Sequence, residues 1–283
     1  LGVYGTPRYG TMDPTWMLFF FYPLFFGMIV GGIGYGMIML SVILWLRFKF
    51  RENKSIQAAT SILGPAATMV IAFGFLYAEF FGDLLGVRYL NWVEMIQIGG
   101  VDLPFHRVQL VIPFMLVAIG VGVVHVMLGL VFGVVNAIRT KNTHHLWEKG
   151  GILAFLLGVA AAVAMSLPIV TGNLGNWAAG AQIAFALVAL AGVVFAIRGG
   201  KVMGAIELIE SVAHIASYIR IMAVGLAGAI FADAVTSIVA GLANIPILAI
   251  MVAVLLHSLN IIIAAFSPTI HALRLNFLEF FGK

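Results

Sequence analysis

Long apolar runs separated by short charged segments organise this sequence. No Asp, Glu, Lys or Arg occurs in residues 14–46, 55–78, 108–138, 150–197 and 234–273. Continuous apolar runs of about 20 residues predict membrane-spanning helices, whereas the strands of a membrane barrel alternate over about ten. The pattern therefore predicts an all-α, polytopic membrane protein.

Glycine, proline and charged positions divide these runs into about eight predicted spans: 15–30, 33–47, 58–78, 108–138, 150–171, 177–197, 201–240 and 246–280. The first two could instead form one overlong helix, but the glycines of VGGIGYGM favour a break. The last two exceed the about 20 residues that cross a bilayer, so we expect them to be tilted, kinked or extended into water. We expect residues 1–283 to form a single transmembrane domain.

Composition and charge support this class. The chain is 63% hydrophobic and 9% charged, which excludes a soluble globular domain. Its net charge of +4 comes from Lys and Arg beside apolar spans, which indicates membrane topology rather than nucleic-acid binding. With eight spans, these basic residues gather on one side, which predicts cytoplasmic N- and C-termini. The start at Leu1, without a signal peptide, leads us to expect a piece of a longer protein.

Two arginines, Arg220 and Arg274, stand in or next to the most apolar segments. A guanidinium at mid-membrane costs about 2.5–3.5 kcal/mol on insertion scales, and it stays protonated at ordinary pH. Such residues indicate function. The alternative for Arg220 is a buried ion pair with a carboxylate that only holds helices together.

The other polar groups of the last two spans follow helical stripes. Glu207, Glu210, Ser211 and His214 have the spacing of one helix face, and so do Asn260, Ser267, His271 and Arg274, although Pro268 could bend the second stripe. Glu207 and Glu210 lie close enough to Lys201 to face cytoplasmic water instead.

The remaining histidines and Asp233 carry weaker signals. We expect His125 to be a packed, hydrogen-bonded side chain, and His144 and His145 to lie in a loop without a metal. Asp233, near the outer end of its span, is either solvated or, with His257 and Ser258, a candidate for an outer ion path. The absence of cysteine excludes disulfides and thiolate metal sites.

Four stretches carry a family resemblance: YGTPRYGTMDPTWMLFFFYPLFFGMIVGGIGYG, GVVHVMLGLVFGVVNAI, ELIESVAHIASYIRIMAVGLAGAIFADAV and LLHSLNIIIAAFSPTIHALRLNFLEFFGK. In this order they resemble the membrane domain of the large stator subunit of rotary V/A-type ATPases, called subunit I in archaea and bacteria and subunit a in vacuoles. The resemblance runs along the whole chain and implies eight helices.

The resemblance implies two ion half-channels beside a rotating proteolipid ring. It places Arg220 and Arg274 as partners of the rotor carboxylate, Glu207 on the cytoplasmic half-channel, and His271 where the family has a polar Gln or His. Glu210 and His214 would line the same cytoplasmic path, and Asn260 and Ser267 are weaker path candidates. No cofactor or metal is implied.

Three departures qualify the resemblance. The first hairpin reads GGIGYG where many relatives have an aspartate after the first glycine. Gly228 and Ala264 stand where vacuolar relatives carry a histidine and a glutamate, which leaves the outer half-channel open and favours the prokaryotic branch. The family's soluble N-terminal arm is absent from this sequence.

The sequence thus predicts a stator subunit that couples proton or sodium movement to ring rotation, in a prokaryotic plasma membrane and without catalytic activity of its own. The implied partners are the proteolipid ring, the lipid bilayer and, through the absent arm, soluble ATPase subunits and peripheral stalks. No Walker A motif is present. The alternatives are a self-contained cation-coupled secondary transporter, which would show repeated halves, and a membrane scaffold, which would leave the arginines unexplained.

Overall fold

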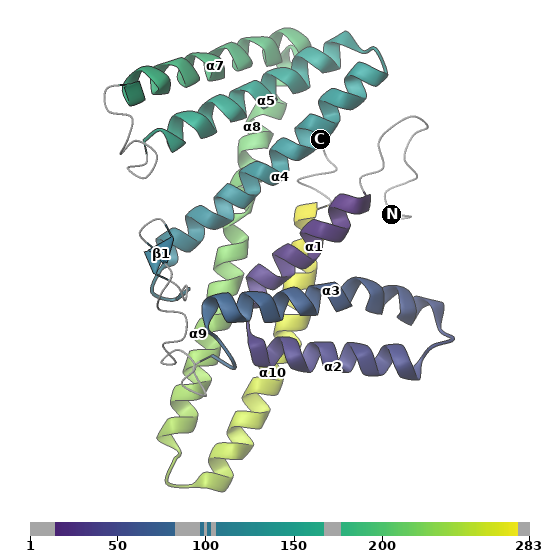
Figure 1. Ribbon diagram of the computed structural model, residues 1–283, viewed down its shortest axis with the longest axis vertical. Coiled ribbons are helices and arrows are strands. Elements are labelled where there is room, and N and C mark those ends of the chain that lie inside the picture. The colour runs from purple at the N-terminus through teal and green to yellow at the C-terminus, as the bar shows by residue number, and fades with distance from the viewer. Residues whose placement is uncertain (1–14, 83–96, 99–100, 103–105, 167–176, 277–283) are drawn as a thin grey trace. The chain divides into compact units, whose positions relative to one another are not determined.

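The computed structural model describes residues 15–82, 97–98, 101–102, 106–166 and 177–276 (Figure 1). Its helices are α1 (Thr15–Val30), α2 (Ile33–Lys49), α3 (Lys54–Tyr77), α4 (Val111–Arg139), α5 (Thr143–Ala164), α7 (Trp177–Gly200), α8 (Val202–Ser217), α9 (Ile219–Gly241) and α10 (Pro246–Arg274). Two short antiparallel strands, β1 (Gln97–Ile98) and β2 (Val101–Asp102), form a minor hairpin. The predicted all-α class is confirmed.

Six helical segments of the described chain are long and apolar enough to cross a membrane. They are α3, α4, α5, most of α7, the 40-residue stretch of α8 and α9 together, and α10. The predicted count of eight adds α1 and α2 and stays a prediction. The predicted span ends at 171 and 280, and both chain termini, fall outside the described residues.

The described chain divides into two compact units. Unit 1 contains residues 119–166 and 177–218, with most of α4 and all of α5, α7 and α8. Unit 2 contains the described residues from 15 to 118 and from 219 to 276, with α1, α2, α3, α9 and α10.

Helices α5 and α7 pair closely in unit 1 because small residues line their contact. A Cβ atom added at Gly151 or Gly158 of α5 would collide with the α7 backbone at Ala196 or Ala189. Gly192 of α7 likewise faces the backbone of Phe155. Close approach of helix backbones at small residues is typical of membrane helices.

The predicted break between the first two helices is present in unit 2. Helix α1 ends at Val30 and α2 begins at Ile33, and Gly31 between them has a φ of +41°, which glycine adopts without strain. The first amides of α2 are bonded by the chain after α3: Ile33 N–H donates to the Glu79 carbonyl at 2.8 Å and Gly34 N–H to the Phe80 carbonyl at 3.1 Å. The break therefore leaves no exposed backbone at these positions.

Helix α5 begins seven residues before the predicted start at 150. The Asn142 side chain accepts a hydrogen bond from the His145 N–H at 3.3 Å and so caps the helix. The expectation that His144 and His145 lie in a loop is therefore wrong. Both lie in the first turn of α5, because the cap starts the helix before the charged residues that suggested a loop.

Candidate functional site

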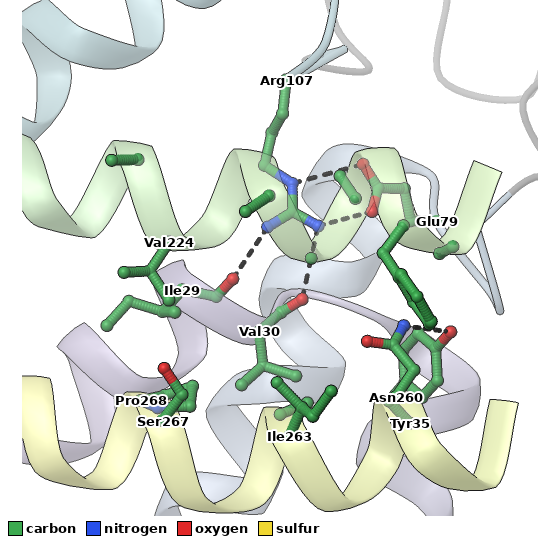
Figure 2. Close-up of a pocket in the computed structure, with 17 residues that line it drawn as sticks. Ile29, Val30, Tyr35, Glu79, Arg107, Val224, Asn260, Ile263, Ser267 and Pro268 are labelled. Atoms are coloured by element: carbon green, nitrogen blue, oxygen red, sulfur yellow. Dashed lines mark hydrogen bonds and ion pairs between the residues drawn. The ribbon is translucent and has the colours of Figure 1, made fainter. Parts of the chain in front are cut away.

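A cavity of about 450 Å³ lies inside unit 2 (Figure 2). Small residues of α9, including Ala223, Ala227 and Gly228, form one wall. The opposite wall belongs to α10, with Asn260, Ile263 and Ser267, and the remaining wall comes from Ile29, Val30, Tyr35, Glu79 and Arg107. An apolar cavity with a few convergent polar groups is the usual form of a binding or transport site.

Arg107 and Glu79 form a buried ion pair at one end of this cavity. The Arg107 side chain is 1% exposed and that of Glu79 is 5% exposed. Arg107 Nε donates to Glu79 Oε1 at 3.2 Å, and Nη2 lies 2.5 Å from Oε2. Burial lowers the pKa of Arg107, but the neighbouring Glu79 carboxylate outweighs it and holds that pKa above its ordinary value. The guanidinium is therefore permanently charged.

The same guanidinium also caps helix α1. It donates to the carbonyls of Ile29 at 3.0 Å, Val30 at 3.3 Å and Gly31 at 3.2 Å (Figure 2). These carbonyls end a helix, where backbone acceptors lack partners and a positive charge is favourable. Arg107 also lies 4.5 Å above the Tyr77 ring. One arginine thus joins the end of α1 to the end of α3.

Asn260 of α10 bonds to the first turn of α2. Its Nδ2 donates to the Tyr35 hydroxyl at 2.8 Å, and this hydroxyl lies 3.0 Å from His257 Nδ1. All three side chains are buried. The hydroxyl thus links Asn260 to His257, and the tautomer of the imidazole decides which of the hydroxyl and His257 Nδ1 donates. Asn260 and Tyr35 therefore form a polar wall of the cavity that is fixed on both helices.

The two arginines singled out by the sequence both lie in unit 2. Arg220 is half-buried in the first turn of α9, and Arg274 is exposed as the last residue of α10. His271, half-buried one turn before Arg274, lies within electrostatic range of both guanidinium groups. Ser267, one turn earlier again, lines the cavity. The structure thus brings Arg220, His271 and Arg274 together near one end of the cavity.

Glu207 lies in unit 1 and has a basic partner. Its carboxylate forms an ion pair with Lys149 of α5, and the two side chains are 17% and 12% exposed. Of the rest of its stripe, Ser211 is buried, His214 is half-buried and Glu210 is exposed. The four residues therefore differ in their exposure although they have the spacing of one helix face. The reason is that α8 packs against both α5 and α7. Full exposure of Glu207 to water is excluded, whereas Glu210 is exposed.

The weaker candidates separate into packed and exposed groups. His125 is fully buried, with Nδ1 2.5 Å from the Tyr218 hydroxyl, which confirms the expected packed, hydrogen-bonded role. Asp233 is half-buried and Ser258 is exposed.

Sequence reasoning missed Glu79, Arg107, Tyr35, Glu148 and Lys149. Glu79 and Arg107 lie at the ends of apolar runs, where a charged residue is ordinarily solvated. Their opposite charges were a usable signal, but a separation of 28 positions in the sequence hid the pair. Lys149 was read only as a topology marker.

Comparison with known proteins supports the family resemblance that the four sequence stretches carry. The chain is 28% identical to an A-type ATP synthase subunit I from Archaeoglobus fulgidus over 330 aligned residues, which cover 99% of this chain and 48% of the relative. The chain is similar to ATP synthase subunit I along almost its whole length. The subunit I of Halobacterium salinarum is 32% identical over 56% of the chain and 22% of the relative. A V-type ATP synthase subunit I from Chlamydia pneumoniae is 27% identical over 99% of the chain and 50% of the relative.

The chain therefore spans about half the length of the subunit I relatives that it matches over its full extent. No protein-family model matches it. None of the relatives described here is a self-contained transporter, so that alternative has no support from them.

Proposed function

We propose that this chain is the ion-translocating membrane part of the stator of an A/V-type rotary ATP synthase. The observation that carries the proposal is the grouping of Arg220, His271 and Arg274 in unit 2, near one end of a cavity with polar walls. The subunit I relatives supply the context. The chain acts within a larger complex and has no catalytic activity alone.

The cavity of Figure 2 forms the outer half-channel. Glu79 and Arg107 follow α3, on the side opposite to the basic α2–α3 connection, which the positive-inside rule assigns to the cytoplasm. From there the cavity extends to Ala223, one helical turn after Arg220, and to Ser267, two turns before Arg274. Tyr35, Asn260 and Ser267 supply its polar wall. Vacuolar relatives carry a histidine and a glutamate at the positions of Gly228 and Ala264, and in this chain the three polar residues take over their role.

The arginines separate the two half-channels. A rotor carboxylate crosses lipid only when neutral, because its ionised form is expensive in hydrocarbon. Opposite Arg220 the carboxylate is stabilised as an anion and releases its ion, and the fixed positive charge prevents a direct leak. The exposed Arg274 receives the carboxylate as it leaves Arg220, and His271 orients Arg274 or bonds to the carboxylate.

Glu207, Glu210 and His214 form the cytoplasmic half-channel. The ends of α4, α5, α7 and α8 near Glu207 carry Arg139, Lys141, Lys149, Arg198 and Lys201, which marks this end of unit 1 as cytoplasmic. The partners of the chain are a proteolipid ring in the bilayer and, beyond this sequence, the soluble ATPase subunits and peripheral stalks. The location is a prokaryotic plasma membrane with cytoplasmic termini.

Arg220→Ala in the complete complex tests the proposal. We expect assembly to persist, since the change removes a costly charge, and ATP-driven ion uptake into vesicles to stop. Arg220→Lys should also be severely impaired, because an ammonium lacks the guanidinium fork and permanent charge. Arg139→Met, at the exposed end of α4, is the control. Near-normal uptake by Arg220→Ala would refute the mechanism.

Two further measurements complete the test. A small proteolipid and soluble ATPase subunits should copurify with the chain, and a chain that transports ions alone would favour the transporter alternative. Uptake measured with and without sodium distinguishes H⁺ from Na⁺ as the coupling ion.

A further inference from the structure

A buried cluster of charged groups surrounds Glu207 in unit 1. The Glu207 carboxylate pairs with Lys149, and it lies within electrostatic and hydrogen-bonding range of the Glu148 carboxyl group. Glu148 is 8% exposed, and its Oε2 lies 3.3 Å from His145 Nδ1. His145 is exposed, so the cluster reaches from the surface of unit 1 into its interior.

The shape of α7 makes room for this cluster. A Cβ atom at Gly200 would collide with the Glu148 carboxyl group, and one at Gly199 would collide with the backbone at Glu148. The two glycines at the end of α7 therefore allow Glu148 to point toward α8. Any larger residue at position 200 would displace the carboxyl group.

The balance of charges determines how many protons the two carboxyl groups of the cluster carry. Two largely shielded carboxylates beside a single lysine leave one negative charge that the lysine does not compensate, which is costly away from water. Two carboxyl groups within hydrogen-bonding range can bond to each other only when one proton lies between them, because a carboxylate oxygen is only an acceptor. With one shared proton, the pair carries a single negative charge and Lys149 neutralises it. His145, which is exposed to water, adds a positive charge beside Glu148 only when it is protonated.

Water can reach the cluster through a second cavity. This cavity of about 250 Å³ is lined by Asn136, Thr140, His145 and Lys149, among others, from α4, α5 and the turn between them. A water molecule occupies about 30 Å³ in the liquid, so the cavity has room for several. It adjoins Lys149, the partner of Glu207, and His145, the partner of Glu148.

We propose that Glu148 is a second proton-carrying residue of the cytoplasmic path, that it shares one proton with Glu207, and that Lys149 is the positioning residue that balances their charge. The proposal rests on the function proposed above and assigns its coupling ion as a proton. A hydronium ion in the cavity transfers a proton to Glu148 and becomes water, while the shared proton moves fully to Glu207. Glu207 then passes one proton to the ionised rotor carboxylate that the proposed function places opposite Arg220, and the pair again holds one.

Glu148→Gln in the complete complex tests this path. Glutamine keeps the size and hydrogen bonding of the side chain but cannot carry a proton. Because a positioned acid or base contributes about 10²–10⁴-fold, we expect ATP-driven proton uptake into vesicles to fall at least about tenfold and its pH profile to change. Glu148→Asp, which keeps the carboxyl group, should recover part of the rate. Glu52→Gln, an exposed change in the basic α2–α3 turn, is the matched control.

Lys149 gives an independent measurement that does not depend on assembly of the Glu148 variant. Lys149→Arg keeps the charge and should retain uptake, whereas Lys149→Met should lose it and shift the pH profile. Equal rates for the two Lys149 variants would overturn the proposal. So would a Glu148→Gln rate equal to that of Glu52→Gln at every pH.

Arg220→Ala, measured in parallel, separates this inference from the proposed function. If uptake stops in Arg220→Ala but is normal in Glu148→Gln, only the shared-proton path fails. If Arg220→Ala pumps normally, the proposed function fails. Uptake of sodium rather than protons by the unmodified complex would also refute the path, because a shared proton cannot carry sodium.

Discussion

Removing the buried Arg107 guanidinium should destabilise unit 2 more than removal of any surface arginine. Arg107→Met preserves most of the side-chain volume but leaves the Glu79 carboxylate and the carbonyls at the end of α1 without their donor. Removing one partner of a buried ion pair lowers the free energy of unfolding by about 3–5 kcal/mol, whereas an exposed ion pair contributes only about 0–1 kcal/mol to it. At about 2–4 °C per kcal/mol for a domain of this size, the melting temperature should fall by roughly 6–20 °C.

Thermal unfolding of the purified protein in detergent, followed by tryptophan fluorescence, measures this change. Arg139→Met at the exposed end of α4 is the matched control and should shift the melting temperature little. The double variant Arg107→Met with Glu79→Met should be less destabilised than the sum of the single changes, since neither charge is then left unpaired. A shift for Arg107→Met as small as that for Arg139→Met would refute the reasoning.

The pH dependence of the same experiment follows from the raised pKa of Arg107. A group whose pKa is higher in the folded state stabilises the fold fully at every pH below its unfolded pKa, which for arginine lies far above neutral pH. The guanidinium therefore stays charged from pH 6 to pH 9. The melting-temperature loss caused by Arg107→Met should therefore persist at pH 9, and a loss that disappears at pH 9 would contradict the assignment.

Three further changes test other parts of the structure. Arg274→Ala should reduce ATP-driven uptake nearly as much as Arg220→Ala, with His271→Ala intermediate; normal uptake in Arg274→Ala would exclude the second arginine. Tyr35→Phe removes the hydroxyl that bonds Asn260 and His257 and should cost about 1–3 kcal/mol in thermal unfolding, more than Tyr77→Phe, whose hydroxyl makes one long bond to the Met28 carbonyl. Gly151→Val should separate α5 from α7 and lower the melting temperature, whereas Gly150→Ala, which meets open space, should not; equal effects would argue against the close helix contact.

The helices and their main interruption could be predicted from the sequence because their signals are local. Apolar runs define the long helices, and the glycines of VGGIGYGM mark the break that the structure places at Gly31 and Gly32. The start of α5 was misplaced because Glu148 and Lys149 looked like loop charges. In the structure their charges are satisfied by partners on α5 and α8, so the helix continues through them.

The polar walls of the site could be predicted only in part. Arg220, His271, Arg274, Ser267 and Asn260 were found because charged or amide groups in an apolar helix are conspicuous. Burial of the Glu79–Arg107 pair was not predictable, since it depends on packing between segments 28 residues apart. Tyr35 was missed because a tyrosine beside glycines in an apolar run looks like ordinary packing.

The bonds at the break between α1 and α2 impose an order on the assembly of unit 2. The last carbonyls of α1 are bonded by Arg107, and the first amides of α2 by the carbonyls of Glu79 and Phe80. A buried backbone group without a partner costs free energy comparable to a lost hydrogen bond. During synthesis, the first hairpin therefore cannot reach its final conformation until the ribosome has produced the chain through residue 107. A fragment that ends after α3 would keep the sequence of the first three helices and lack the arginine that completes the end of the first.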